Sequence, residues 1–294
     1  MSEDDAQDET LLETLQLERI ELNLFRGTSP DVRPGRIFGG QVIAQSLLAA
    51  YETVEDRVCH SLHCYFIRPG DPTVPIVFEV DRSRDGGSFT TRRVIAVQHG
   101  KQIFNLAASF MAPEEGFEHQ AQMPEGPHWS TLPDEAELAR RAAEKNPAMM
   151  NEMMKHWMMR QRPIEMRSPD ARTYWMDGKP KEPVSHNWIR CRTEIGGDPR
   201  MHQVILAYAS DMNLLSTGMR PHAVHWQTPG FQSASLDHAM WFHKATDFTR
   251  WHLYHQDSPS TSGGRGFIRG SIYAEDGTLV ASVAQEGLMR MRKS

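Results

Sequence analysis

The strongest constraint on the fold is an internal duplication, because one order of helix and strand patterns occurs twice along the 294 residues. In the first occurrence a helix pattern at QVIAQSLLAA, after Gly39-Gly40, is followed by four β-rich runs between Cys59 and Met111. The second occurrence begins near Ser185 with a strand-like HNWIRCR, a helix pattern at HQVILAYASDMNLL and four further strand runs. We therefore predict two copies of one unit built from a helix and four or five strands.

Short sequence matches fall in the same order in both copies. The tripeptide QVI occurs in both helix patterns, and the dipeptide SL begins at Ser61 in one copy and at Ser235 in the other. Glycine turns at Gly100 and Gly277 precede the last strand of each copy. Ahead of the first copy, the apolar residues between 11 and 24 predict a short amphipathic helix that runs to Arg26-Gly27.

Composition narrows the class of protein and its surroundings. The net charge is −6, and five acidic residues lie within the first ten positions, so the rest of the chain is nearly neutral and does not suggest a nucleic-acid surface. The three cysteines form no CxxC pair, which favours a reduced compartment. No apolar run approaches the roughly 18 residues of a membrane-spanning helix, and an acidic N-terminus is atypical of a signal peptide. We expect a cytoplasmic protein without a nucleic-acid partner or stable membrane association.

A glutamine in the last strand distinguishes the second copy from the first. Alternation along TLVASVAQEGLMR places Gln285 on the same face as Val283 and Met289, where an amide needs hydrogen-bond partners. Counted from the two glycine turns, Gln285 corresponds to Ala108. The fold itself therefore does not require an amide at this position.

An aspartate in the second helix pattern differs in the same way. At 100° per residue, Asp211 falls on the edge of the buried stripe, and its counterpart in the first copy is Ala49. A capping or turn-bonding aspartate near a helix end is the alternative interpretation. Ser235 is a third candidate by its position in the strand that follows this helix, although Ser61 occupies the matching place in the first copy. The pattern indicates one polar site that is present in one copy only.

Several stretches resemble the type II acyl-CoA thioesterases, the TesB-like family. They are IFGGQVIAQSLLAA, FIRPGD, YASDMNLL, SLDHAMWFH, GRGFIRG and LVASVAQEGLMR, and together the resemblance covers most of the chain. It implies an α+β double hot-dog fold, in which each of two tandem hot-dog domains is an antiparallel sheet wrapped around a long central helix. The family is known for a water-activating Asp, Thr or Ser, and Gln, which match Asp211 in YASDMN, Ser235 in SLDH and Gln285 in QEG.

The resemblance also implies a domain organisation. We expect an acidic disordered tail at 1–10, an N-terminal hot-dog domain at 11–123, a helical connector at 124–183, and a C-terminal hot-dog domain at 184–294 that carries the active site. The methionine-rich part of the connector suits either a flexible apolar surface for acyl chains or a helix packed against the body.

The implied reaction is hydrolysis of fatty acyl-CoA to free fatty acid and coenzyme A by direct attack of water. Asp211 would accept the proton, while Ser235 and Gln285 would position the water. The sequence contains no Gly-x-Ser-x-Gly elbow, so a covalent serine route lacks its usual scaffold. The alternatives are a non-catalytic acyl-CoA or lipid-binding hot-dog protein and a hot-dog enoyl-CoA hydratase, which would need an acid/base histidine paired with an aspartate.

No cofactor or metal is expected. Histidines three apart in strand-like runs, His60 with His63 and His252 with His255, point to opposite faces and cannot bind one ion together. His60 is a secondary candidate for substrate contact. Four arginines suit either coenzyme A phosphates or ordinary sheet-surface positions: Arg68, Arg92, Arg93 and Arg269. The partners implied by the family are the acyl-CoA substrate and further copies of the chain, as a dimer or tetramer.

Overall fold

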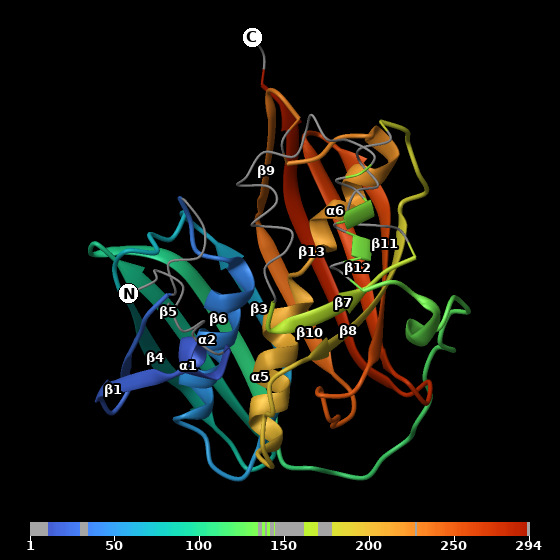
Figure 1. The fold of residues 1–294 in the computed structure, drawn as a ribbon. Coiled ribbons are helices and arrows are strands. Elements are labelled where there is room, and N and C mark those ends of the chain that lie inside the picture. The colour runs from blue at the N-terminus through green and yellow to red at the C-terminus, as the bar shows by residue number, and fades with distance from the viewer. Residues whose placement is uncertain are drawn as a thin grey trace, which may run out of the picture. The chain divides into compact units, whose positions relative to one another are not determined.

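The computed structural model describes residues 11–29, 35–134, 137–138, 140–141, 144, 162–169, 178–226 and 228–292. The chain separates into two compact units (Figure 1). Unit 1 comprises Met1–Glu114 with Thr193–Tyr208, and unit 2 comprises Glu115–Arg192 with Ala209–Ser294. The expected acidic tail and the methionine-rich part of the connector lie outside the described residues. The domain boundaries inferred from the sequence stay a prediction.

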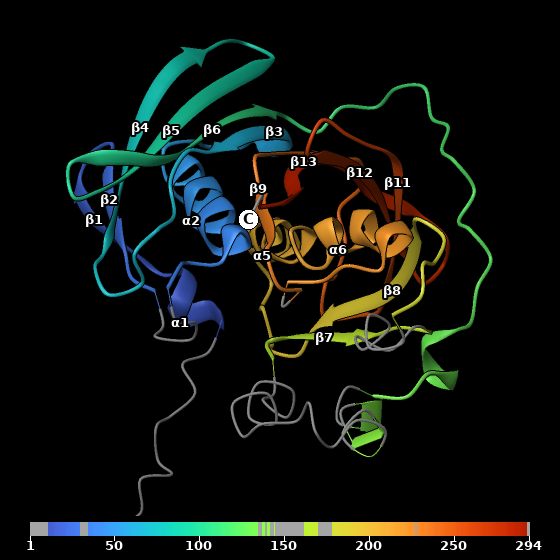
Figure 2. The ribbon, with the colours of Figure 1, turned by 90° about the horizontal axis from the view of Figure 1, so that it is seen from above.

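Unit 1 is an antiparallel sheet with a helix against one face (Figure 2). Its strands lie side by side in the order β1-β2-β4-β5-β6-β3. The elements are α1 (Leu11–Leu15), β1 (Leu17–Glu21), β2 (Leu24–Gly27), α2 (Gly39–Tyr51), β3 (Val58–Phe66), β4 (Ile76–Asp85), β5 (Phe89–Gln98) and β6 (Lys101–Met111). Helix α2 contacts β4, β5 and β6, and nearly all of its side chains are buried.

The glycine pair at the start of α2 permits a close contact between backbones. A Cβ on Gly40 would lie 2.2 Å from the carbonyl oxygen of Tyr208, far inside van der Waals contact. Tyr208 belongs to α5 (Pro199–Ser210), which begins in unit 1 and ends in unit 2. Gly40 therefore allows two helices to pack closely.

The helix predicted across residues 11–24 is only partly correct. Helix α1 ends at Leu15, and the chain continues as the two short strands β1 and β2. Strand β2 pairs with β4, and β1 pairs with β2. Pairing with the sheet outweighs the helical periodicity of these residues, and Ile20 in β1 and Leu22 in the turn after it are exposed.

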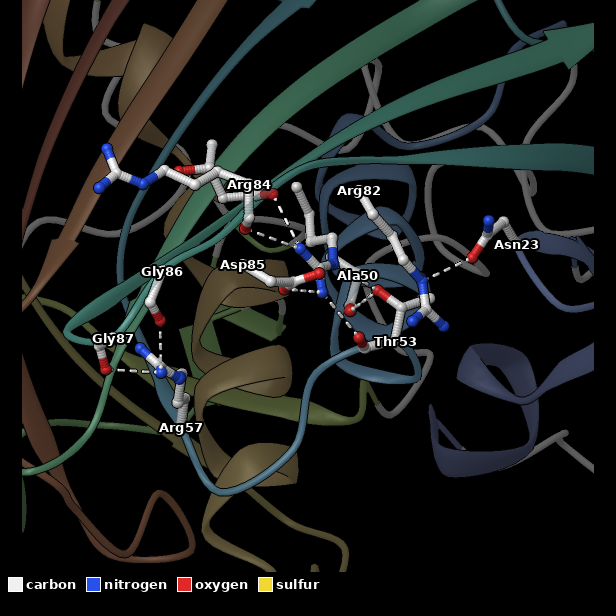
Figure 3. A network of polar contacts seen from close by, with 11 residues as sticks. Asn23, Ala50, Thr53, Arg57, Arg82, Arg84, Asp85, Gly86 and Gly87 are labelled. Atoms are coloured by element: carbon white, nitrogen blue, oxygen red, sulfur yellow. Dashed lines mark hydrogen bonds and ion pairs between the residues drawn. The ribbon is translucent and has the colours of Figure 1, made fainter.

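A buried arginine connects the β4–β5 hairpin to the segment after α2, and Figure 3 labels two of the residues that it bonds, Thr53 and Asp85. The Arg92 guanidinium donates to Thr53 Oγ1 and to the Thr53 carbonyl, both at 2.9 Å, and to Asp85 Oδ1 at 2.6 Å. Further donations reach the carbonyls of Arg84 at 3.1 Å and Thr91 at 3.0 Å. Arg92 is 2% exposed. Because its donors are engaged inside unit 1, Arg92 is not available to a coenzyme A phosphate.

Unit 2 repeats the strand topology of unit 1. Its sheet has the order β10-β13-β12-β11-β8-β7, and β9 also pairs with β13. The elements are β7 (Ile164–Arg167), β8 (Val184–Cys191), α6 (Leu214–Met219), β9 (Phe231–Ser235), β10 (Asp237–Phe242), β11 (His252–Ser262), β12 (Arg265–Ala274) and β13 (Leu279–Met291). Helix α6 packs against β11, β12 and β13 (Figure 1). The strands after α6 follow the order 11-12-13-10, just as those after α2 follow the order 4-5-6-3, which confirms the predicted duplication and the α+β double hot-dog fold.

Matching irregularities show which residues of the two sheets are equivalent. The β5–β6 ladder shifts register around Ile103. The Ile103 carbonyl accepts a hydrogen bond from the backbone N–H of Ile67, just after the end of the neighbouring strand β3. The β12–β13 ladder shifts around Val280, whose carbonyl accepts from His243. Five residues beyond each shift lie Ala108 and Gln285, so the equivalence predicted from the glycine turns is confirmed.

Candidate active site

Gln285 occupies a buried position in the middle of β13. The strand alternates as predicted, with Val283, Gln285 and Met289 on the buried side, and Gln285 is 1% exposed. In the β9–β13 ladder Ser235 stands opposite Gly287, two residues from Gln285 and therefore on the same face. The Gln285 amide nitrogen donates to Ser235 Oγ at 2.9 Å.

The other end of the same amide meets a histidine. His238 Nδ1 lies 2.6 Å from Gln285 Oε1, and His238 Nε2 lies 2.8 Å from the hydroxyl of Ser210, the last residue of α5. Burial lowers the pKa of His238 to about 4, so the ring is neutral at pH 7. Ser210, His238, Gln285 and Ser235 thus form one continuous chain of hydrogen bonds inside unit 2.

His238 was missed by the sequence argument. Continuing the β10–β13 register by one residue from Ala239↔Ala284 places His238 opposite Gln285, and in unit 1 the residue opposite Ala108 is Leu62. The repeated dipeptide SL had instead matched Leu62 with Leu236. That match is two residues out of register. An alignment based on strand register would have revealed a second polar residue, His238, in place of an apolar one.

Asp211 does not lie within a helix, contrary to the expectation from periodicity. Helix α5 ends at Ser210, and α6 begins only at Leu214. Between them Asn213 adopts a left-handed conformation with φ of 60°, which a continuous helix does not allow. Asp211 therefore lies in a tight turn between two helices, as the alternative interpretation of an aspartate near a helix end proposed. In unit 1 the equivalent Ala49 lies inside the uninterrupted helix α2.

Two buried side chains of β11 hold this turn in place. The Tyr254 hydroxyl donates to the Ser210 carbonyl at 2.6 Å, and the Gln256 amide donates to the Met212 carbonyl at 3.3 Å. Tyr254 and Gln256 are two residues apart, so they share one face of the strand. The residue between the two anchored carbonyls is Asp211. Burial raises the pKa of Tyr254 well above its usual value, and the negative charge of Asp211 raises it further.

The helix that follows the turn packs closely against β13. A Cβ on Gly287 would lie 2.4 Å from a methyl group of Leu215, which is on α6 four residues after Asp211. Gly287 is the residue opposite Ser235. Of the three residues expected at the site, Ser235 and Gln285 bond directly, and Asp211 directly follows Ser210 of the same network. Their catalytic roles stay a prediction.

Three of the remaining candidates have other partners. His60 Nε2 lies 2.8 Å from Ser109 Oγ, Arg68 donates to the Gln102 carbonyl at 2.6 Å, and Arg269 donates to Asp257. Among the described residues, no three His, Cys, Asp or Glu side chains gather closely enough to hold a metal ion. In the same part of the chain no helix is long and apolar enough to cross a membrane.

Two tandem units, each an antiparallel sheet packed on a helix, define a double hot-dog protein with a buried polar site in the second unit. Residues 154–288 match the family model for acyl-CoA thioesterase, and residues 28–111 match that for the acyl-CoA thioesterase N-terminal domain. The chain belongs to the acyl-CoA thioesterase family, of the type II, TesB-like kind.

Individual relatives are similar along almost their whole length. Acyl-CoA thioesterase 2 of Haemophilus influenzae is 37% identical over 281 residues, which cover 95% of this chain and 96% of the relative. Acyl-coenzyme A thioesterase 8 of Homo sapiens is 39% identical over 291 residues, which cover 95% and 88%. The crystal structure of an acyl-CoA thioesterase II, TesB2, from Mycobacterium marinum is 39% identical and superposes with a TM-score of 0.77, covering 96% of this chain and 98% of that one.

Proposed function

We propose that this chain hydrolyses fatty acyl-CoA to free fatty acid and coenzyme A, and that Asp211, Ser235 and Gln285 direct a water molecule onto the thioester carbonyl carbon. Membership of the acyl-CoA thioesterase family supports the reaction. The observation that carries the site is the buried Gln285 amide bonded to Ser235, at a position where unit 1 has an alanine.

Each of the three side chains has a distinct task in this proposal. Asp211 accepts a proton as the water oxygen bonds to the carbonyl carbon, and Ser235 and Gln285 hold that water in line. The tetrahedral intermediate then collapses, the carbon–sulfur bond breaks, and the proton on Asp211 is available to the departing thiolate. A hydroxyl and an amide suit the positioning of water because each carries both a donor and an acceptor.

The rival functions are less well supported by the site. A non-catalytic binding protein has no need of a buried polar network in unit 2 at the places that Leu62 and Ala108 occupy in unit 1. A hydratase needs a histidine that exchanges protons with substrate, whereas the ring nitrogens of His238 bond a hydroxyl and an amide inside unit 2. That arrangement suits the orientation of Gln285.

The surroundings of the reaction belong to the same proposal. We expect the protein in the cytoplasm, as a homo-oligomer of two or four copies, with the active site in the C-terminal hot-dog region 184–294, after an N-terminal region 11–123 and a connector 124–183. Light scattering on the purified chain measures the number of copies. Limited proteolysis measures where the connector can be cut.

The test is a comparison of variants on short-, medium- and long-chain acyl-CoA, with thiol release as the readout. Gln285→Ala should lower kcat by on the order of 10²-fold, since one positioning hydrogen bond in a preorganised site is lost, and Asp211→Asn by at least as much. Gln98→Ala is the matched control, because Gln98 is a buried glutamine of unit 1 that bonds the carbonyls of Asp71 and Val74, each at 2.8 Å. A folded Gln285→Ala with turnover like that of the control would refute the site.

A further inference from the structure

The hydrogen-bond chain around Gln285 has a direction that follows from the placement of its amide oxygen and nitrogen. An amide oxygen only accepts hydrogen bonds, and an amide nitrogen only donates them. Gln285 Oε1 lies 2.6 Å from His238 Nδ1, and Gln285 Nε2 lies 2.9 Å from Ser235 Oγ. Because the oxygen cannot donate, the hydrogen of the first contact is on His238 Nδ1.

The second ring nitrogen follows from the first. A neutral imidazole carries one N–H, so His238 Nε2 is an acceptor, and the Ser210 hydroxyl donates to it across 2.8 Å. His238 is 1% exposed, and this burial keeps the ring neutral at pH 7. The contact with Gln285 therefore defines the tautomer of His238, and the Ser210 hydroxyl, which can donate or accept, is compatible with it.

We propose that His238 is a positioning residue, which holds the Gln285 amide in the one orientation that donates to Ser235. With the hydrogen on His238 Nδ1, a rotated amide would set Gln285 Nε2–H against His238 Nδ1–H, two donors in a buried place, so the amide can rotate only if the ring changes tautomer as well. Ser235 then always receives a hydrogen from Gln285, and its own hydroxyl hydrogen is directed to another group. The inference rests on the proposed roles of Gln285 and Ser235, because the group that receives this hydrogen would be the attacking water.

The pair is not needed for the fold. In unit 1 the equivalent places opposite each other in β3 and β6 are occupied by Leu62 and Ala108, both buried. The same ladder thus forms with an apolar pair in one unit and a hydrogen-bonded His–Gln pair in the other. A buried polar pair that the fold can replace with apolar residues indicates a functional constraint.

The tautomer is measurable without reference to catalysis. In ¹⁵N-labelled protein at pH 7, the ring signals of His238 should show a protonated Nδ1 and an unprotonated Nε2, the less common form of neutral histidine. Gln285→Leu should remove this preference, since nothing then requires a donor at Nδ1. A ring protonated on Nε2 in the unsubstituted protein would overturn the inference, whatever the variants do to turnover.

Kinetics test the consequence for the reaction. His238→Leu removes the donor to Gln285 and should lower kcat by on the order of 10²-fold with little change in KM. His238→Asn keeps a donor near the Nδ1 position and should restore kcat to within about tenfold of the unsubstituted protein. If His238→Leu fails to fold, His238→Gln serves instead, because its terminal amide fits near Nε2, bonds Ser210 and leaves Gln285 without its donor.

A double variant separates this inference from the proposed function. If His238 acts through Gln285, His238→Leu should cause no further loss of kcat in a Gln285→Ala background. If the two losses of kcat multiply in the double variant, the role of His238 is overturned. The same follows if His238→Leu folds and has turnover close to that of the unsubstituted protein while Gln285→Ala is impaired. Either result leaves the proposed function standing. Full turnover in Gln285→Ala would instead refute the proposed site.

Discussion

The neutral, buried state of His238 makes a quantitative prediction about acid stability. Burial lowers the pKa of His238 to about 4 in the folded protein, whereas an exposed histidine in the unfolded chain has a pKa of about 6.5. Between these two values the unfolded chain binds a proton that the folded chain does not. The free energy of unfolding therefore falls as the pH is lowered from about 6.5, and the loss is complete near pH 4.

The size of the effect follows from the difference between the two pKa values. Each pH unit of difference corresponds to about 1.4 kcal/mol, so His238 should cost the folded state roughly 3 kcal/mol over this window. His238→Asn carries no titrating ring and should lack this part of the pH dependence. Other buried histidines, such as His252, whose pKa is also lowered by burial, contribute equally to both proteins and cancel in the difference.

Urea unfolding at several pH values between 7 and 4 measures the difference directly. The gap between the free energies of unfolding of His238→Asn and the unsubstituted protein should move by roughly 3 kcal/mol in favour of the variant on acidification. If the units unfold separately, the change belongs to the transition of unit 2. His119→Asn at an exposed position is the control and should leave the pH dependence unchanged. A gap that moves by less than about 1 kcal/mol would refute the buried, neutral histidine.

Two further predictions concern residues that support the site or lie far from it. Tyr254→Phe removes the hydroxyl that anchors the Ser210 carbonyl, so Asp211 should lose its fixed position. We expect kcat to fall about tenfold and the free energy of unfolding to fall by about 1 kcal/mol. An unchanged kcat would show that the turn needs no such anchor. Arg92→Met should destabilise unit 1 by about 2 kcal/mol or more, because the Thr53 carbonyl and its neighbours lose a buried donor. The KM for acyl-CoA should stay the same. A large rise in KM in the folded variant would instead indicate a phosphate contact.

The sequence was sufficient for the duplicated strand topology because local periodicity indicates which side of each element faces the core. Alternation in the last strand placed Gln285 among buried residues, and β13 has that alternation. The order of helix and strands, repeated twice, predicted the duplicated topology that the two sheets share. Comparing the copies was enough to single out Gln285, because Ala108 occupies the equivalent place in a sheet built the same way.

Only the tertiary structure determined the details of the site. His238 and Gln285 are 47 residues apart in the sequence, and their contact depends on a strand register that is interrupted at Leu236 between β9 and β10. The break before Asp211 was equally hidden, since the periodicity of the helix continues through it. Tyr254 and Gln256, from a distant strand, bond the carbonyls on either side of Asp211. A sequence pattern reports which residues are buried, but which buried polar atoms meet is decided by pairing between distant strands and helices.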